Sequence, residues 1–478
     1  MSSLPIISPA VIERRQVDTA ATQALDSAHY MHPFTDTQGL AAKGARVVTH
    51  ADNIYIWDSE GKKLLDAMSG LWCVNIGYGR TELAQAAYLQ MMELPYYNSF
   101  FNSTNVPAVR LAAKLSSLAP RVGDRHFSHV FFSSSGSESN DTNIRMVRHY
   151  WATLGQPERK VIIARHNAYH GSTIGGASLG GMRGMHEQGD LPIPGIVHID
   201  QPYGVEHGRD GESEHDFGLR MARQLEDKIL SIGAEKVAAF IGEPVQGAGG
   251  VIIPPASYWP EIQRIVDKYG ILLISDEVIC AFGRLGAWFA YEQFGYKPDL
   301  VTFAKGVTSG YQPLGGVMVG NRVADVLIQQ GGEFNHGYTY SGHPVACAVA
   351  LANIEWMEKQ QLVERVKNDT APYLAKAFAS LADHPLVGDL RSCGMVASLA
   401  LVQHKAPLTL FDSKLAIGMV CRAHCLNTGV IMRAVGERMI IAPPLVISRE
   451  QIDQMIAMIR RSLDLTLADA RQQGWLTG

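Results

Sequence analysis

The sequence is poor in cysteine and has no long hydrophobic run, and these absences exclude several classes of protein. Six cysteines are spread over 478 residues, which is too dispersed for the disulfide framework of a small secreted domain. No apolar run approaches the ~20 residues that a transmembrane helix needs. The first 15 residues lack a basic segment followed by an apolar one, so they are not predicted to be a signal peptide. We therefore expect a cytoplasmic protein with reduced thiols.

An excess of charge of either sign is also missing. The chain has 42 Lys and Arg against 46 Asp and Glu, which gives a formal net charge of −4. A nucleic-acid partner needs a concentration of positive charge, so neither nucleic acid nor a membrane is expected as a partner. The nucleotide fingerprints G-x-x-x-x-G-K-[ST] and G-x-G-x-x-G are absent as well, which argues against ATP and NAD.

One short stretch carries three possible metal ligands at helical spacing, namely Cys421, His424 and Cys425. The alternative is a cysteine-lined helix packed in a reducing compartment. We favour this alternative and predict no metal site, because no second cluster of ligands accompanies the first.

What the sequence does have is an alternation of strands and helices through its middle. Helix-period stretches at 137–154, 216–232 and 258–269 separate several of the apolar runs. Strands that are apolar on both faces and alternate with helices predict an α/β fold with a mostly parallel sheet. The runs are "HVFFSS" (129–134), "KVIIAR" (160–165), "IVHI" (196–199), "VAAFIGEP" (237–244), "GILLISDE" (270–277) and "LVTFAK" (300–305).

The chain is too long for a single core, so two domains are expected. The first ~40 residues are weakly patterned and predict an N-terminal arm, and 51–66 alternates around a turn at 59–61, as a hairpin does. Beyond 351, amphipathic helices, a strand at 395–402 and a terminal helix from Arg449 predict a smaller α+β domain. The expected division is 1–75 for the arm and part of the small domain, 76–345 for the large domain and 346–478 for the rest of the small domain.

The first of four candidate sites follows the strand "HVFFSS". Ser135 and Glu138 fit the S-x-x-E capping box, which is a purely structural explanation. Small residues at a helix start, here Ser135, Gly136 and Ser137, also expose backbone N–H groups that can bind a phosphate.

Two further strands also end in residues that can bind a ligand. Tyr169 and His170 follow "VIIARHNA", and the tyrosine ring is either half-buried packing or a platform for a planar cofactor. Asp276 follows "GILLIS", where a carboxylate must be paired or meet a ligand. It is either a helix cap or ion pair, or the partner of a protonated ring nitrogen.

The fourth strand ends at Lys305, although an ammonium group is costly to bury. Desolvation lowers the pKa of a lysine, and a neutral amine can form a Schiff base with an aldehyde. A phosphate cradle, a stacking ring, an acid and an amine at successive strand ends together predict pyridoxal 5′-phosphate (PLP) chemistry.

With these residues, the sequence resembles the class III, fold-type I, PLP-dependent aminotransferases, in particular the ω-amine:pyruvate group. The resemblance covers nearly the whole chain, from 32 to 444. It implies a large domain with a mostly parallel seven-stranded sheet flanked by helices. Its motifs are "GLWCVNIGYGR" (70–80), "SGSESNDT" (135–142), "YHGSTIGGASLGGM" (169–182), "EPVQGAGG" (243–250), "SDEVICAFGR" (275–284), "AKGVTSGY" (304–311) and "YTYSGHP" (338–344).

The resemblance implies that Lys305 binds PLP covalently and moves the proton, while Asp276 pairs with the ring nitrogen. Tyr169 and Val278 would cover the two ring faces. Thr339 of the partner subunit would complete the phosphate site, so a homodimer or a dimer of dimers is expected. The remaining residues expected around the cofactor are Ser135, Gly136, Ser137, His170, Glu243, Gln246 and Tyr338.

For the substrates, the resemblance implies an aromatic pocket and a mobile arginine. Arg433 would bind the carboxylate of pyruvate or of an amino acid through a bidentate pair and swing aside for an apolar amine. The alternative for Arg433 is a surface ion pair. The expected pocket residues are Phe34, Trp72, Phe100, Phe101 and Tyr169.

The sequence also departs from the pattern of this family at three positions. Ser134 stands where asparagine is frequent, Ala281 where glycine is usual, and Tyr338 where phenylalanine is commoner. None of these changes removes a catalytic group, but Ala281 and Tyr338 can alter the pocket.

The expected reaction is therefore a ping-pong transfer of an amino group from an ω-amine or ω-amino acid to pyruvate, giving alanine and an aldehyde or ketone. The alternatives are a PLP-dependent aminomutase, racemase or decarboxylase, and, in another class, a non-catalytic binding protein or a nicotinamide dehydrogenase. The sequence leaves the donor open between a diamine, an ω-amino acid and an aromatic amine.

Overall fold

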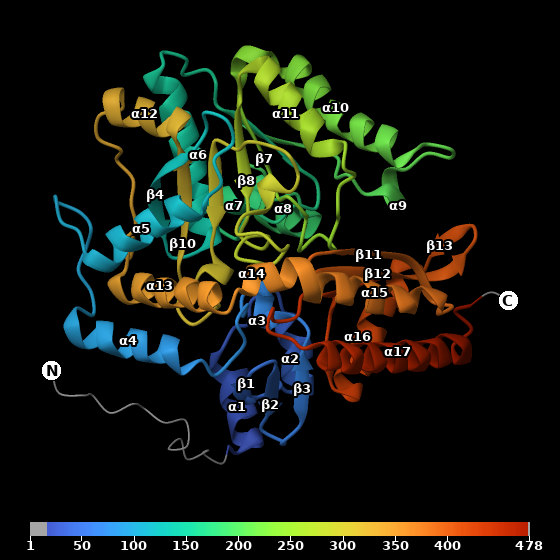
Figure 1. Cartoon of the computed structure of the whole chain (residues 1–478). Helices are drawn as coiled ribbons and strands as arrows, with labels where there is room; N and C mark the ends of the chain where they lie inside the picture. Colours follow the sequence, from blue (N-terminus) through green and yellow to red (C-terminus); the bar gives the residue numbers. More distant parts are fainter. Residues whose placement is uncertain (1–16, 477–478) are drawn as a thin grey trace.

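The computed structural model describes residues 17–476, and its central feature is a seven-stranded sheet (Figure 1). The strand order is β4-β10-β9-β8-β7-β5-β6, and only β10 runs antiparallel to its neighbours. The prediction of a mostly parallel sheet is therefore confirmed. The strands are β4 Phe127–Ser133, β5 Val161–Arg165, β6 Ile196–Ile199, β7 Val237–Gly242, β8 Leu272–Asp276, β9 Leu300–Phe303 and β10 Gly315–Gly320.

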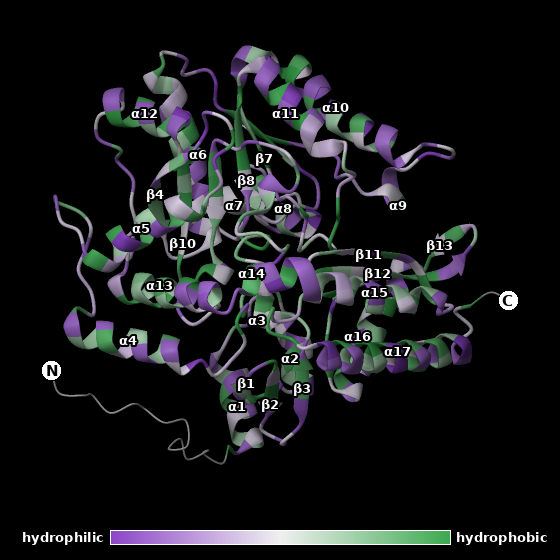
Figure 2. Cartoon of the chain, viewed as in Figure 1, coloured by the Kyte–Doolittle hydropathy of each residue, from purple (hydrophilic) through white to green (hydrophobic). Residues whose placement is uncertain are grey.

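Helices cover both faces of this sheet, because its strands alternate their side chains between two apolar clusters. Leu272 and Ile274 pack with Ile144 on one face, whereas Leu273 packs with Trp259 on the other. Figure 2 shows hydrophobic residues along the central strands and mixed residues on the surrounding helices. The first face carries α6 Gly136–Thr153, α7 Ile174–Leu179 and α12 Asn321–Gln330, and the second α5 Val106–Leu118, α10 Glu214–Ile232 and α11 Tyr258–Tyr269.

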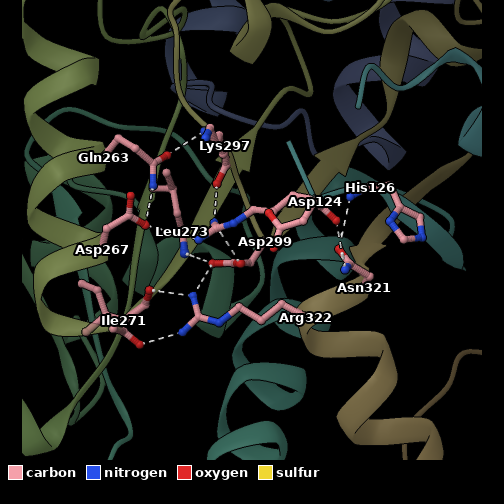
Figure 3. A network of polar contacts seen from close by, with 12 residues as sticks. Asp124, His126, Gln263, Asp267, Ile271, Leu273, Lys297, Asp299, Asn321 and Arg322 are labelled. Atoms are coloured by element: carbon pink, nitrogen blue, oxygen red, sulfur yellow. Dashed lines mark hydrogen bonds and ion pairs between the residues drawn. The ribbon is translucent and has the colours of Figure 1, made fainter. Parts of the chain in front are cut away.

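Polar contacts hold the amino end of this sheet (Figure 3). Asp299, which precedes β9, accepts hydrogen bonds from the backbone N–H of Leu273 at 2.9 Å and from Arg322 Nη1 at 3.2 Å. Arg322 also donates to the carbonyls of Gly270, at 2.8 Å, and Ile271, at 3.4 Å. At this end of the sheet the polar groups satisfy one another's hydrogen bonds. The residues that were expected to form a site lie at the opposite end, where the strands finish.

A second, antiparallel sheet lies in the C-terminal part, in the order β11-β12-β16-β15, with β13 beside β12. The predicted strand at 395–402 overlaps β12, which begins at Val396 and continues to Lys405, and the terminal helix begins at Arg449 as expected. His424 in α16 pairs with Asp469 of α17 at 2.7 Å. The elements are α15 Ala371–Ala379, β11 Val387–Cys393, β12 Val396–Lys405, β13 Leu408–Leu410, α16 Ile417–Thr428, β15 Arg433–Val435, β16 Arg438–Ile441 and α17 Arg449–Gln472.

A third sheet joins the two ends of the chain, because β14 pairs in parallel with β3, with Val430 opposite Leu65. The predicted hairpin at 51–66 is confirmed as β2 and β3. Residues 1–16, which include the stretch not predicted to be a signal peptide, lie outside the described residues. The elements are α1 Thr19–His29, α2 Thr37–Lys43, β1 Val48–Asp52, β2 Tyr55–Asp58, β3 Lys63–Asp66 and β14 Val430–Ile431.

The remaining helices connect these sheets. Between residues 17 and 476, none of the helices combines the length and the apolar character that crossing a bilayer requires. They are α3 Ser69–Trp72, α4 Thr81–Glu93, α8 Arg183–Gly189, α9 Gly204–His207, α13 Pro344–Lys359 and α14 Leu362–Arg365.

Candidate active site

A cavity of about 320 Å³ opens at the carboxyl ends of the sheet strands. All four predicted strand ends contribute to its wall, which is the place where ligands bind in parallel α/β sheets. The residues that line it are Ser134, Ser135, Gly136, Ser137, Asn140, Tyr169, His170, Gly171, Glu243, Asp276, Val278, Ile279, Ala304, Lys305, Thr308, Gly310, Gln312, Pro313 and Leu314.

The first wall is the start of α6. Ser135 accepts a hydrogen bond from Glu138 N at 3.2 Å, and the Glu138 carboxylate accepts one from Ser134 N at 2.7 Å, so the capping interaction is present. Gly136 lies against Val278, and a Cβ at this position would be 2.9 Å from Val278 Cγ2. This α6 start therefore brings backbone N–H groups and serine hydroxyls to the cavity, which suits a phosphate.

The carboxylate of Asp276 forms the second wall and is nearly fully buried. Its Oδ2 accepts a hydrogen bond from Asn140 Nδ2 at 2.7 Å and lies 2.7 Å from His170 Nδ1. Its Oδ1 accepts one from Val278 N at 3.1 Å. These contacts fix the carboxylate in the cavity wall, where it can pair with a protonated ring nitrogen.

Behind Asp276 lies a chain of neutral polar groups that sequence reasoning missed. Asn140 Oδ1 accepts hydrogen bonds from Asn143 Nδ2 and Thr302 Oγ1, both at 2.9 Å, and all three side chains are fully buried. Asn140 stands inside the motif "SGSESNDT", but its neighbour Thr302 comes from β9. Only the fold brings these residues together.

Lys305 stands at the third wall, in a single 3₁₀ turn that follows β9. Its φ of 47° is left-handed, which is rare for a residue with a side chain. Desolvation lowers the pKa of the Lys305 ammonium group, and the charges of Asp276, Cys73 and Glu243 oppose this effect. The structure therefore places a buried amine with a lowered pKa in the same cavity wall as the carboxylate of Asp276.

Tyr169 and Glu243 form the remaining wall. Glu243 accepts hydrogen bonds from Tyr169 N at 3.1 Å and from Gly247 N at 2.8 Å, and burial raises the pKa of this carboxyl group. The Tyr169 hydroxyl lies 2.9 Å from Ser172 Oγ. Tyr169 and Val278 both line the cavity, and their contact with the two faces of a cofactor ring stays a prediction.

Three other residues predicted around the cofactor, Gln246, Tyr338 and Thr339, do not line this cavity. Gln246 is buried and donates to the carbonyl of His166 at 3.1 Å. Tyr338 OH donates to the carbonyl of Glu138 at 2.9 Å, and the carbonyl of Thr339 accepts a hydrogen bond from Tyr96 OH at 2.8 Å.

The aromatic residues predicted for the substrate pocket are dispersed. The ring of Phe34 lies 6.4 Å from that of Tyr169. Phe100 and Phe101 are 38% and 90% exposed, and Trp72 is 1% exposed, packed in an apolar cluster with Ile279. Their contact with a substrate stays a prediction.

Arg433, on β15, carries a charge that reaches the site. Its positive charge lowers the pKa of Lys305, and burial lowers the pKa of Arg433 itself. The charge of Tyr169 acts in the opposite direction and raises the pKa of Arg433. Arg433 is not among the residues that line the cavity, and its contact with a substrate carboxylate stays a prediction.

Two of the three departures from the family pattern also contact the site. Ser134 lines the cavity, and the hydroxyl of Tyr338 binds the first turn of α6. Ala281 is buried in the main apolar cluster and does not line the cavity.

Comparison with known proteins gives consistent matches. The model of the family described as aminotransferase class-III matches residues 40–463. A putrescine–pyruvate aminotransferase of Pseudomonas aeruginosa is 58% identical over 456 residues, which cover 95% of this chain and 98% of that protein. A diaminobutyrate–2-oxoglutarate transaminase of Halomonas elongata is 41% identical and covers 95% of each chain.

Solved structures agree with this chain over nearly its whole length. An (S)-enantioselective omega-transaminase from Thermomicrobium roseum matches with a TM-score of 0.91 and 42% identity, over 95% of this chain and 100% of that one. The omega transaminase from Pseudomonas jessenii in complex with PMP matches with a TM-score of 0.91 and 38% identity, over 95% and 99% of the two chains.

Proposed function

Because the chain belongs to the class-III aminotransferases, we propose that it transfers an amino group from an ω-amine or ω-amino acid to pyruvate, in a ping-pong reaction that yields alanine and an aldehyde or ketone. The observation that carries this proposal is the 58% identity, over nearly the full length of both chains, to a putrescine–pyruvate aminotransferase. No observation favours an aminomutase on this scaffold.

The class III aminotransferases use PLP, and the cavity suits this group. Serine hydroxyls and N–H groups at the start of α6 can donate hydrogen bonds to its phosphate. Asp276 can pair with its protonated ring nitrogen, and the amine of Lys305 can bond to its aldehyde. When bound, PLP supplies the carbonyl that accepts the amino group and a ring that withdraws electrons from the reacting carbon.

In this proposal Lys305 binds PLP covalently and, once released from it, takes the proton from the donor carbon and returns it during the reaction. Its lowered pKa suits this role, because only the neutral amine can accept a proton. Asp276 keeps the ring nitrogen protonated, and Asn140 and His170 hold Asp276 in place.

The donor class is inferred from the relative that is 58% identical to this chain. Since that protein is a putrescine–pyruvate aminotransferase, we infer that an aliphatic diamine is the preferred donor of this chain. Arg433 would bind the carboxylate of pyruvate in the second half of the reaction, and Phe34, Trp72, Phe100 and Phe101 would line the donor side.

We also infer that the enzyme is a cytoplasmic homodimer, or a dimer of dimers. Exposed apolar side chains follow one another along α4 and the next loop, and Tyr340 joins them through the ring of Tyr96, 5.7 Å away. A surface of this kind fits a second copy of the chain. Thr339 of the partner subunit would complete the phosphate site. The exposed residues are Tyr88, Leu89, Met91, Met92, Tyr96, Tyr97, Phe100, Phe101 and Tyr340.

Two measurements test the proposed function. Purified protein with PLP, pyruvate and a panel of amines should form alanine, with putrescine among the best donors. Borohydride reduction followed by peptide mass spectrometry should find PLP fixed at Lys305. No alanine from any donor, or a label elsewhere, would refute the proposal.

A further inference from the structure

A guanidinium group is buried near Lys305 at a point where distant parts of the chain meet. Arg284 is 0% exposed. It donates from Nη1 to the carbonyls of Met395, at 3.3 Å, and Pro443, at 2.6 Å. It donates from Nη2 to Ser69 Oγ, at 3.2 Å, and to Asn75 Oδ1, at 2.8 Å. None of these acceptors carries a full charge, so the site buries a cation without an ion-pair partner among them, an arrangement that costs stability.

Asn75 links Arg284 to the turn that carries Lys305. Its Oδ1 accepts the bond from Arg284, and its Nδ2 donates to the carbonyl of Phe282 at 2.8 Å, so both ends of the amide are fixed. A Cβ at Gly306 would lie 2.5 Å from Asn75 Nδ2. The amide therefore lies directly against the residue that follows Lys305, and the missing side chain of Gly306 makes room for it.

A second asparagine holds the same turn from α13. Asn353 Nδ2 donates to the carbonyls of Gly306 and Val307, both at 3.0 Å, and Ser309 Oγ donates to Asn353 Oδ1 at 2.8 Å. The left-handed φ of Lys305 persists only if its surroundings fix it. Two amides do so, and one of them depends on Arg284.

We propose that Arg284 is a positioning residue for amino-group transfer: by holding Asn75 against Gly306, it sets where the amine of Lys305 stands relative to the reacting carbon. This inference rests on the proposed function, in which Lys305 moves the proton. Proton transfer requires hydrogen-bond distance between the base and the carbon, so a small displacement of this turn slows that step without weakening the binding of the donor.

The test compares Arg284→Met, Asn75→Ala and the double variant with wild type, all as holoenzymes. Arg322→Met is the matched control, because Arg322 also binds two backbone carbonyls but lies at the amino end of the sheet (Figure 3). The probe is putrescine with deuterium on the carbons next to its nitrogens, with pyruvate as acceptor. The readouts are kcat, KM, the isotope effect on kcat and hydrogen–deuterium exchange.

We expect Arg284→Met to lower kcat about tenfold or more with little change in KM, because a misplaced base costs at least this much. The isotope effect should rise, since proton transfer becomes the slow step. Asn75→Ala should lower kcat and raise the isotope effect in the same way. The double variant should have a kcat no lower than that of either single variant, because both changes act through the same contact. Exchange should increase in peptides covering 303–310. The control should lower Tm and leave the isotope effect unchanged.

An isotope effect equal to that of wild type in Arg284→Met, or additive losses in the double variant, would overturn the role of Arg284. If Arg284→Met does not fold, Arg284→Lys and Asn75→Ala carry the same test, because each disturbs the amide against Gly306. Failure of wild type to form alanine would instead refute the proposed function, and the two failures are thereby distinguished.

Discussion

At the scale of single residues, the site depends on charged groups that are buried. Burial lowers the pKa of the Lys305 ammonium group, and the buried carboxylate of Asp276 accepts hydrogen bonds from Asn140 Nδ2 and Val278 N. The sequence pointed to both residues, because a charge directly after a buried strand requires an explanation. It could not point to Asn75 or Arg284, whose side-chain hydrogen-bond partners lie 111 to 215 positions away.

Arg433 allows the first prediction. Arg433→Ala should lower kcat/KM for pyruvate by roughly ten- to a hundredfold, because a hydrogen bond to a charged group is worth about 1.5–3 kcal/mol. Deamination of a diamine in a single half-reaction should change much less. Arg460→Ala, which removes a surface ion pair with Asp383, is the control. Equal losses in both half-reactions would mean that Arg433 is structural.

A pH effect is expected from His198, which donates to the carbonyl of Gly180 from the edge strand β6. Burial and the neighbouring His166 lower the pKa of His198 to about 4. The unfolded chain, with a histidine pKa near 6.5, therefore binds this proton at a higher pH than the native state does. His198 lowers the free energy of unfolding as the pH falls from about 6.5 to about 4, and adds no further loss below that.

The measurement is the difference in Tm between pH 7.5 and pH 5. This difference should be smaller in His198→Gln than in wild type, because glutamine keeps a donor and does not titrate. His404→Gln is a control in the C-terminal strand β12. An unchanged difference in His198→Gln would contradict the lowered pKa.

At the scale of elements, the sequence predicted the strands and helices that have a clear hydrophobic pattern within their own residues. The six apolar runs became strands of the sheet, and α11 matches its predicted range at both ends. The strand β10 was missed, because "GGVMVG" opens with two glycines and runs antiparallel at a place where parallel strands were expected. The helix α1 was missed within a segment that was expected to be weakly patterned.

The start of α6 gives a prediction at this scale. Gly136→Ala would press a methyl group into Val278, whose branched side chain has little freedom to turn away. Overpacking costs about 1–3 kcal/mol, so the Kd for PLP should rise roughly five- to 150-fold if this cost falls on the phosphate site. Gly184→Ala, in α8 with open space around its Cβ, should leave PLP binding unchanged. If both variants bound PLP with equal affinity, the close contact between Gly136 and Val278 would have no role in the binding of PLP.

At the scale of the whole molecule, the site is expected to need two chains. The loop 333–343 is fastened to its own α6 by Tyr338 and by His336, whose Nε2 lies 2.8 Å from Thr142 Oγ1. This fixed loop can present Thr339 to a second copy of the chain. The sequence indicated this arrangement only through the family resemblance, because no local pattern reveals a contact between chains.

Complementation between subunits tests the shared site. Lys305→Ala and Thr339→Ala are combined in one heterodimer and assayed at limiting PLP. If Thr339 acts on the other chain, one of the two sites has both wild-type residues, and about half of the wild-type activity per dimer should return. The heterodimer of Lys305→Ala with wild type is the control. Activity no higher than in the Thr339→Ala homodimer would show that Thr339 acts within its own chain.

The parallel pairing of β3 with β14 has a consequence for biosynthesis. Asp66 emerges from the ribosome 365 residues before Ile431, its partner in the sheet. At about 5–20 residues per second, the edge of β3 waits roughly 20 to 70 s for its neighbour. Throughout this interval the nascent N-terminal hairpin exposes an unpaired, β-rich edge that can associate with other chains. A slow codon or a premature stop between α13 and β14 should therefore cause aggregation of the incomplete chain, and not only the loss of its activity.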